Sequence, residues 1–166
     1  SKLGWVRCAK GHDIDGSALT YKAGDTYLCQ AQGKSNMSAV FLDSTGRAYT
    51  QPAYKLPSAR GQGEPLTGRF NPSTVAVFRQ AVLGAETQKI VVCGDSGYGF
   101  VTTISDMFTK NKAGKALIKL SEKAKTLTPL LTDYTEDEWL VSVTHAGKIL
   151  VFPITELPKL AKGKGN

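Results

Sequence analysis

The chain has 166 residues, with 21 lysines and arginines against 14 acidic residues, and it carries a net charge of +7 at pH 7. Its content of 41% hydrophobic and 21% charged residues excludes a chain that is disordered by composition. No apolar run approaches the roughly 20 residues that a membrane-spanning helix needs, so we expect a soluble domain with no membrane partner.

Short runs of β-branched and aromatic residues, separated by turn-forming residues, predict an all-β chain. Apolar residues rarely recur at helical spacing. Residues 74–83 fit both a helix and a period of two, and we favour a strand there. The predicted strands, in chain order, are Thr26–Gln32, Ser38–Asp43, Arg47–Thr50, Thr74–Leu83, Lys89–Cys93, Phe100–Ile104, Thr126–Asp133, Glu138–Thr144 and Lys148–Pro153.

Three polar turns end in a glycine, at Gly46, Gly97 and Gly147, which are 51 and 50 residues apart. Each turn joins two predicted strands, as in a β-hairpin, where glycine takes a positive φ without strain. A period of about 50 residues with about four strands per unit is typical of blades arranged radially. We therefore predict a β-pinwheel, a propeller-like disc of roughly four-stranded blades.

The predicted repeat units cover residues 1–36, 37–87, 88–137 and 138–166 approximately, within a single domain, so that three to four blades are represented. The segment Leu3–Arg7 resembles the glycine turn and following strand of a unit. Since the chain opens within a unit and stops on a basic segment, we expect a piece of a longer protein.

A basic, glycine-containing segment follows each hairpin, at Ala59–Gly63, Asn111–Lys115 and Ala161–Gly165. Glycine lets the backbone approach a partner, while lysine and arginine neutralise phosphate charge. No aromatic residue lies within these segments, which favours contact with a duplex backbone over stacking on single strands. The alternative is that they are solvated linkers between blades. The predicted DNA-binding residues are Arg60, Gly61, Gly63, Lys110, Lys112, Lys115, Lys162 and Lys164.

The segments Ala31–Asn36, Ser58–Gly68, Gly97–Phe100 and Lys115–Leu117 resemble the C-terminal domain of the A subunit of bacterial DNA topoisomerase IV. This resemblance implies a β-pinwheel related to that of the gyrase A subunit, whose basic outer surface binds duplex DNA. It also implies a non-catalytic domain that presents a DNA segment to the cleavage core for decatenation and supercoil relaxation. The gyrase box is only approximated, by Arg60, Gly61 and Gly63, so strong wrapping of DNA is not expected.

The same resemblance implies that the partners are duplex DNA, the remainder of the A subunit, and the B subunit. It implies no cofactor in this domain, because the parent enzyme binds ATP and Mg²⁺ elsewhere. Two other classes of function stay open from the residues alone. One is a protein-interaction propeller whose basic rim is incidental, and the other is a small β enzyme such as a glycan hydrolase.

Other reactive residues give no catalytic pattern. Cys8, Cys29 and Cys93 form no C-x-x-C pair, and we expect buried, reduced thiols in a cytoplasmic protein. The paired carboxylates Asp13 and Asp15, and the acidic cluster in 133–138, fit turns better than general acid and base catalysis. The only histidines, His12 and His145, lack the partners of a triad or a zinc site. Trp5 and Trp139 begin predicted strands and are expected to pack in the core or between blades.

Overall fold

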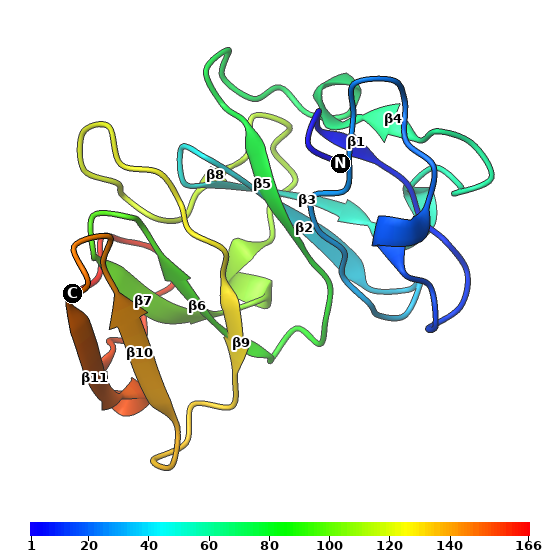
Figure 1. Cartoon of the computed structure of the whole chain (residues 1–166). Coiled ribbons are helices and arrows are strands. Elements are labelled where there is room, and N and C mark those ends of the chain that lie inside the picture. The colour runs from blue at the N-terminus through cyan, green and yellow to red at the C-terminus, as the bar shows by residue number, and fades with distance from the viewer.

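The computed structural model describes all of residues 1–166 and contains strands and single 3₁₀ turns but no α-helix. The strands form four antiparallel sheets (Figure 1). The strands are β1 Trp5–Val6, β2 Ser38–Asp43, β3 Arg47–Pro52, β4 Glu64–Pro65, β5 Phe78–Val82, β6 Lys89–Cys93, β7 Gly99–Thr103, β8 Lys115–Ala116, β9 Leu130–Thr132, β10 Trp139–Val143 and β11 Ile149–Pro153. The 3₁₀ turns are η1 Gly16–Ala18, η2 Ala53–Lys55, η3 Leu66–Gly68, η4 Ser105–Met107 and η5 Ile154–Glu156.

Each sheet is the equivalent of one blade. The first is β1-β4, the second β5-β2-β3-β8, the third β7-β6-β9, and the fourth β10-β11. Only the second sheet has four strands. The short strand that follows each of the first two hairpins joins the sheet before it, since β4 pairs with β1 and β8 with β3. Neighbouring blades are thereby linked by backbone hydrogen bonds as well as by side-chain packing.

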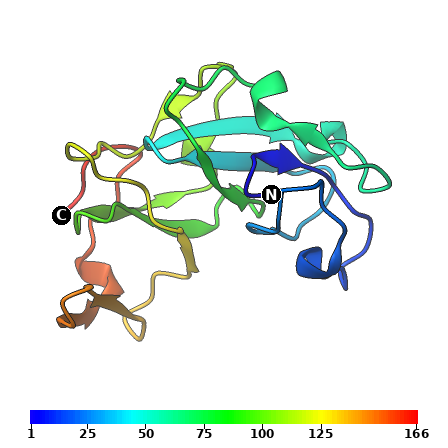
Figure 2. The same cartoon turned by 45° about the horizontal axis from the view of Figure 1, so that its top comes forward.

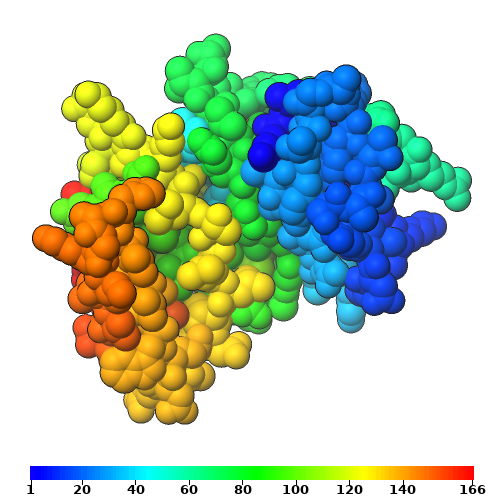
Figure 3. Space-filling view, viewed as in Figure 1, coloured from blue at the N-terminus to red at the C-terminus, as the bar shows by residue number.

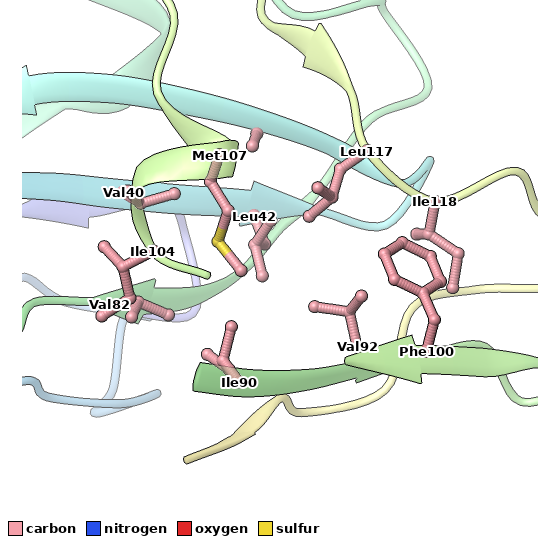
Figure 4. Close-up of a cluster of buried hydrophobic side chains, with 11 residues drawn as sticks. Val40, Leu42, Val82, Ile90, Val92, Phe100, Ile104, Met107, Leu117 and Ile118 are labelled. Atoms are coloured by element: carbon pink, nitrogen blue, oxygen red, sulfur yellow. The ribbon is translucent and has the colours of Figure 1, made fainter. Parts of the chain in front are cut away.

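Alternate residues of one strand pack on opposite sides of the sheet, because successive strand side chains point to opposite faces. Val40 and Leu42 of β2 belong to an eleven-residue cluster that joins the second and third sheets (Figure 4). Phe41 belongs instead to the cluster that includes Leu66 and Phe70. The third sheet lies between the second sheet and the β10-β11 hairpin (Figure 2), and Val91 contributes to the cluster on its other side.

The structure confirms the predicted hairpins. Strands β2 and β6 have the predicted bounds, and β7 begins and ends one residue before its prediction. The turn glycines Gly46, Gly97 and Gly147 have φ of +87°, +88° and +75°. The strand favoured over a helix at 74–83 is confirmed only for Phe78–Val82, since residues 74 and 75 form a turn.

The strand predicted at Thr26–Gln32 is wrong, because these residues form no ladder. In the second sheet, β5 pairs with β2, and β2 in turn with β3. The first sheet contains only β1 and β4, so it has no strand that corresponds to β2 of the second sheet. An extended segment without a neighbouring strand has no partner for its backbone groups, so it does not become a strand.

Trp139 lies on an uncovered face of the fourth sheet and is 61% exposed, so the prediction of a core tryptophan is wrong there. The neighbouring apolar residues of this face are exposed too, and Figure 3 shows the β10 and β11 region (orange) at one edge of the molecule. These residues are Val141, Val143, Ile149 and Val151. In the second and third sheets both faces are covered by neighbouring blades, whereas here only one face is.

The three free thiols differ in exposure, which corrects the expectation that all are buried. Cys8 is exposed, whereas Cys29 and Cys93 are partly buried, and burial raises the pKa of the Cys93 thiol. We therefore expect a thiolate-specific reagent at pH 8 to modify Cys8 at least ten times faster than Cys93, since the thiolate is the nucleophile. Peptide mapping after timed labelling measures both rates, and equal rates would contradict the burial described here.

Candidate nucleic-acid interface

Three connectors, each including one of the predicted basic segments, lie along the edges of successive sheets. We define connector 1 as residues 57–65, connector 2 as residues 108–116 and connector 3 as residues 158–166. Connector 1 forms backbone hydrogen bonds with Cys8, and further along it pairs with β1. Connector 3 forms backbone hydrogen bonds with Val101, and at its end with Gly99. Connector 2 bonds to the Thr50 side chain, with Thr109 N donating over 3.2 Å, and then pairs with β3. The predicted basic segments therefore occupy equivalent places on three neighbouring blades.

A glycine near the end of each connector presses directly on the preceding blade. Gly63, Gly114 and Gly165 have φ of +86°, +75° and +79°. A Cβ at Gly63 would lie 2.3 Å from Val6 O, and one at Gly165 would lie 1.9 Å from Gly99 O. These glycines are required for the docking of one blade on the next. Of the two glycines predicted to contact DNA, only Gly61 faces open space.

Most of the predicted cations of the connectors are at exposed positions. Lys115 differs, because it is half-buried and its ammonium donates a hydrogen bond to the main-chain oxygen of Asp106. The Lys115 side chain therefore ties connector 2 to Asp106 of the third blade. The exposed members are Arg60, Lys110, Lys112, Lys162 and Lys164.

Side chains of the preceding blade hold each connector in place, and the sequence analysis missed them. Arg47 donates from Nε to Ala113 O over 2.9 Å and from Nη2 to Gly114 O over 2.7 Å. Arg7 donates to Gly61 O over 3.4 Å. Tyr98 carries the Lys164 ammonium 3.7 Å from its ring centroid. No shared residue type marks these three positions in the sequence, which is why the repeat pattern did not reveal them.

Almost none of the lysines and arginines form an ion pair within the molecule. The only ion pair joins Arg69 Nη2 and Glu64 Oε2, 2.6 Å apart, in a chain whose net charge is +7. A surface with many unpaired cations carries a positive potential that attracts polyanions. No group of three or more His, Cys, Asp or Glu side chains could hold a metal ion. The helical segments are single turns, and none could cross a membrane.

Two of the acidic residues considered as catalytic groups accept hydrogen bonds from residues of nearby turns. Asp15 Oδ1 accepts from Ser17 N over 2.8 Å and from Ser17 Oγ over 2.6 Å, and these bonds lower the pKa of Asp15. Glu138 accepts from Thr132 and Thr135, which lowers its pKa in the same way. Both carboxylates are thus held ionised by hydrogen bonds within their own loops, as expected of turn residues rather than general acids.

Comparisons with known proteins agree with this architecture. The model of the DNA gyrase C-terminal domain, a beta-propeller, matches residues 88–133 and 138–166. The A subunit of DNA topoisomerase 4 from Haemophilus influenzae is 53% identical over all of this chain. The solved C-terminal domain of E. coli ParC is 48% identical, with a TM-score of 0.92, and the match covers 99% of this chain and 67% of that one. This chain belongs to the family of C-terminal domains of the topoisomerase IV A subunit.

The topoisomerase IV family explains the all-β architecture, and the predicted β-pinwheel is confirmed. A second solved structure, of the C-terminal domain of DNA topoisomerase IV, shares the fold with a TM-score of 0.80 at 17% identity, over 99% of this chain and 54% of that one. The chain spans about a fifth of the curated relatives, 22% of the Haemophilus influenzae protein. These topoisomerase IV relatives therefore extend well beyond the region that this domain matches.

Proposed function

We propose that this domain binds duplex DNA along connectors 1 to 3 and takes no direct part in DNA cleavage. The observation that carries the proposal is the placement of exposed, unpaired cations at equivalent positions on three successive blade edges. Evenly repeated cations suit the regular phosphates of a double helix, and they recognise them without reading bases. Tyr98 supports a duplex over single strands, since the Lys164 ammonium lies over one face of its ring and would compete with a stacked base there.

In the whole enzyme, the domain would present a bound DNA segment to the cleavage core for decatenation and supercoil relaxation. Its partners would then be DNA, the remainder of the A subunit, and the B subunit, in the bacterial cytoplasm at the nucleoid. We propose that ATP and Mg²⁺ bind elsewhere in that enzyme and that this domain uses no cofactor. The gyrase box is only approximated at Arg60–Gly63, which favours contact with a bent or crossed segment over extensive wrapping.

The test replaces four exposed connector cations with glutamine, in the variant Arg60→Gln, Lys110→Gln, Lys112→Gln and Lys162→Gln. Each lost phosphate contact removes about 0.9 from the slope of log K against log salt, so the slope should fall by about 3 to 4. Duplex affinity should fall roughly 100-fold with little dependence on base sequence. Fluorescence anisotropy at several salt concentrations measures both quantities.

A matched variant removes the same number of charges outside the connectors: Lys2→Gln, Lys10→Gln, Lys34→Gln and Lys148→Gln, all at exposed positions. It should keep most of the salt slope, because only long-range charge is lost. If the two variants weaken binding equally, the connectors are not the interface. If the parent chain binds no duplex even at low salt, the basic rim is incidental and a protein-interaction domain becomes the better hypothesis.

A further inference from the structure

A small groove of about 170 Å³ lies on the third sheet, beside connector 3. Connector 3 contributes Lys159, Leu160 and Ala161 to its lining. Asp106 also lines the groove, and its main-chain oxygen accepts a hydrogen bond from Lys115 of connector 2. The groove is therefore lined by connector 3 and linked to connector 2 through Asp106. The remaining lining residues are Lys89, Val101, Thr102 and Thr103.

Two lysines that line this groove lie near the same aromatic ring and have no carboxylate partner. The Lys159 ammonium lies 4.2 Å from the centroid of the Tyr134 ring, and the Lys89 ammonium lies 5.9 Å from it. Lys89 also donates to the main-chain oxygen of Asp133 over 3.1 Å. Neither lysine forms an ion pair. Two like charges at one aromatic ring repel each other, and an anion bound between them would offset that repulsion.

Tyr134 is held firmly as the platform for these lysines. Its hydroxyl lies 3.0 Å from Thr155 O and 2.9 Å from Leu157 O, and its backbone N donates to Thr132 Oγ1 over 2.8 Å. Its φ is +59°, in the left-handed region that side chains other than glycine rarely adopt. Strain of this kind persists where the surrounding structure enforces it, and it is frequent at binding sites.

One oxygen of the only acidic side chain in the groove accepts three hydrogen bonds. Asp106 Oδ2 accepts from Thr103 Oγ1 over 2.8 Å, from Thr102 Oγ1 over 3.3 Å and from Thr103 N over 3.4 Å. It pairs with neither lysine. Since two lysines and one aspartate are among the residues that line the groove, these residues leave one positive charge uncompensated.

We propose that this groove binds a phosphate group between the ammonium groups of Lys89 and Lys159. The phosphate could belong to a DNA backbone that crosses from connector 2 to connector 3, or it could be free. The DNA source rests on the proposed function, whereas the free source does not. Neither lysine was singled out from the sequence, because they are far apart along the chain and meet only when connector 3 docks beside Val101.

The first experiment follows the lysine side-chain NH₃⁺ resonances of the ¹⁵N-labelled chain by NMR while inorganic phosphate is added. The Lys89 and Lys159 signals should shift together and saturate, and Lys159→Gln should raise the apparent dissociation constant at least tenfold. Lys148→Gln, at an exposed lysine in the turn between β10 and β11, should leave it unchanged. Thermal unfolding checks that each variant is folded.

The second experiment repeats the titration with a short duplex. If the duplex shifts the connector lysines together with Lys89 and Lys159, the groove takes a backbone phosphate. If the duplex binds but neither duplex nor phosphate shifts this pair, the proposed groove is overturned and the proposed function stands. If phosphate shifts the pair while no duplex binds, the groove takes a free phosphate and the proposed function fails. If neither ligand produces a shift anywhere, both proposals fail.

Discussion

Replacing Gly46 by alanine is expected to lower the free energy of unfolding by about 4 kcal/mol. Gly46 has φ of +87°, and a Cβ there would lie 2.3 Å from Ile118 O and 2.9 Å from Ile118 Cγ2. The left-handed conformation costs an alanine about 1 to 2 kcal/mol, and forced overlap with neighbouring atoms costs about 1 to 3 kcal/mol more. The melting temperature should fall by about 10 °C, as thermal unfolding followed by circular dichroism will measure.

Gly97 supplies the matched control, because it occupies the same hairpin position one unit later. Its φ is +88°, and nothing lies within 4 Å of a Cβ built there. Gly97→Ala therefore isolates the backbone strain and should cost about 1 to 2 kcal/mol, or about 4 °C. Equal losses for the two variants would show that the overlap of the new Cβ with Ile118 adds no cost beyond the backbone strain.

The Gly46 contact also matters for connector 2. Leu117 and Ile118 follow this connector directly, and both donate backbone hydrogen bonds to Gly46 O, over 3.0 and 3.1 Å. A displaced turn would loosen the connector that carries Lys112 and Lys115. At a temperature where both variants are folded, Gly46→Ala should therefore weaken duplex binding more than Gly97→Ala.

The hairpins could be predicted from the sequence because their signals are local. Alternating apolar residues and a glycine turn lie within one stretch of chain, as in Ser38–Asp43 followed by Gly46, and both strands of the hairpin bury their side chains. The spacing of the glycines then indicates the repeat. These features depend only on neighbouring residues, so the predicted bounds of β2 and β6 agree with the structure.

The features that sequence reasoning missed depend on contacts between distant segments. Thr26–Gln32 has the composition of a strand but lacks a neighbouring strand, and Trp139 begins a strand whose outer face no sheet covers. The contact of Gly63 with Val6 was likewise not foreseen, while its contact with DNA stays a prediction. Arg47 holds connector 2 from 66 residues away, a relation that only the blade-to-blade docking creates.

A second large effect is expected at the buried pair of Tyr49 and Asp43, both of which are fully buried. Asp43 Oδ1 accepts from Thr45 and from Arg47 N, whereas Oδ2 accepts only from the Tyr49 hydroxyl, over 2.7 Å. Tyr49→Phe would leave this oxygen buried without a donor. Since hydrogen bonds to charged groups contribute about 1.5 to 3 kcal/mol, stability should fall by about 2 to 3 kcal/mol in urea unfolding at pH 7. Tyr54→Phe, at a side chain that is 67% exposed, should change it by less than about 0.5 kcal/mol.

The same pair predicts how stability changes in alkali. Burial raises the pKa of Tyr49, and the hydrogen bond and charge of Asp43 raise it further. The folded chain thus keeps the phenol neutral, while an unfolded tyrosine ionises near pH 10. The contribution of Tyr49 is fully present below about pH 10 and is lost as the pH rises above it towards the folded pKa. The stability difference between the parent chain and Tyr49→Phe should therefore narrow between pH 9 and pH 11, as urea unfolding at a series of pH values will measure. A difference that stays constant over this range would show that the phenol ionises equally readily in the folded chain.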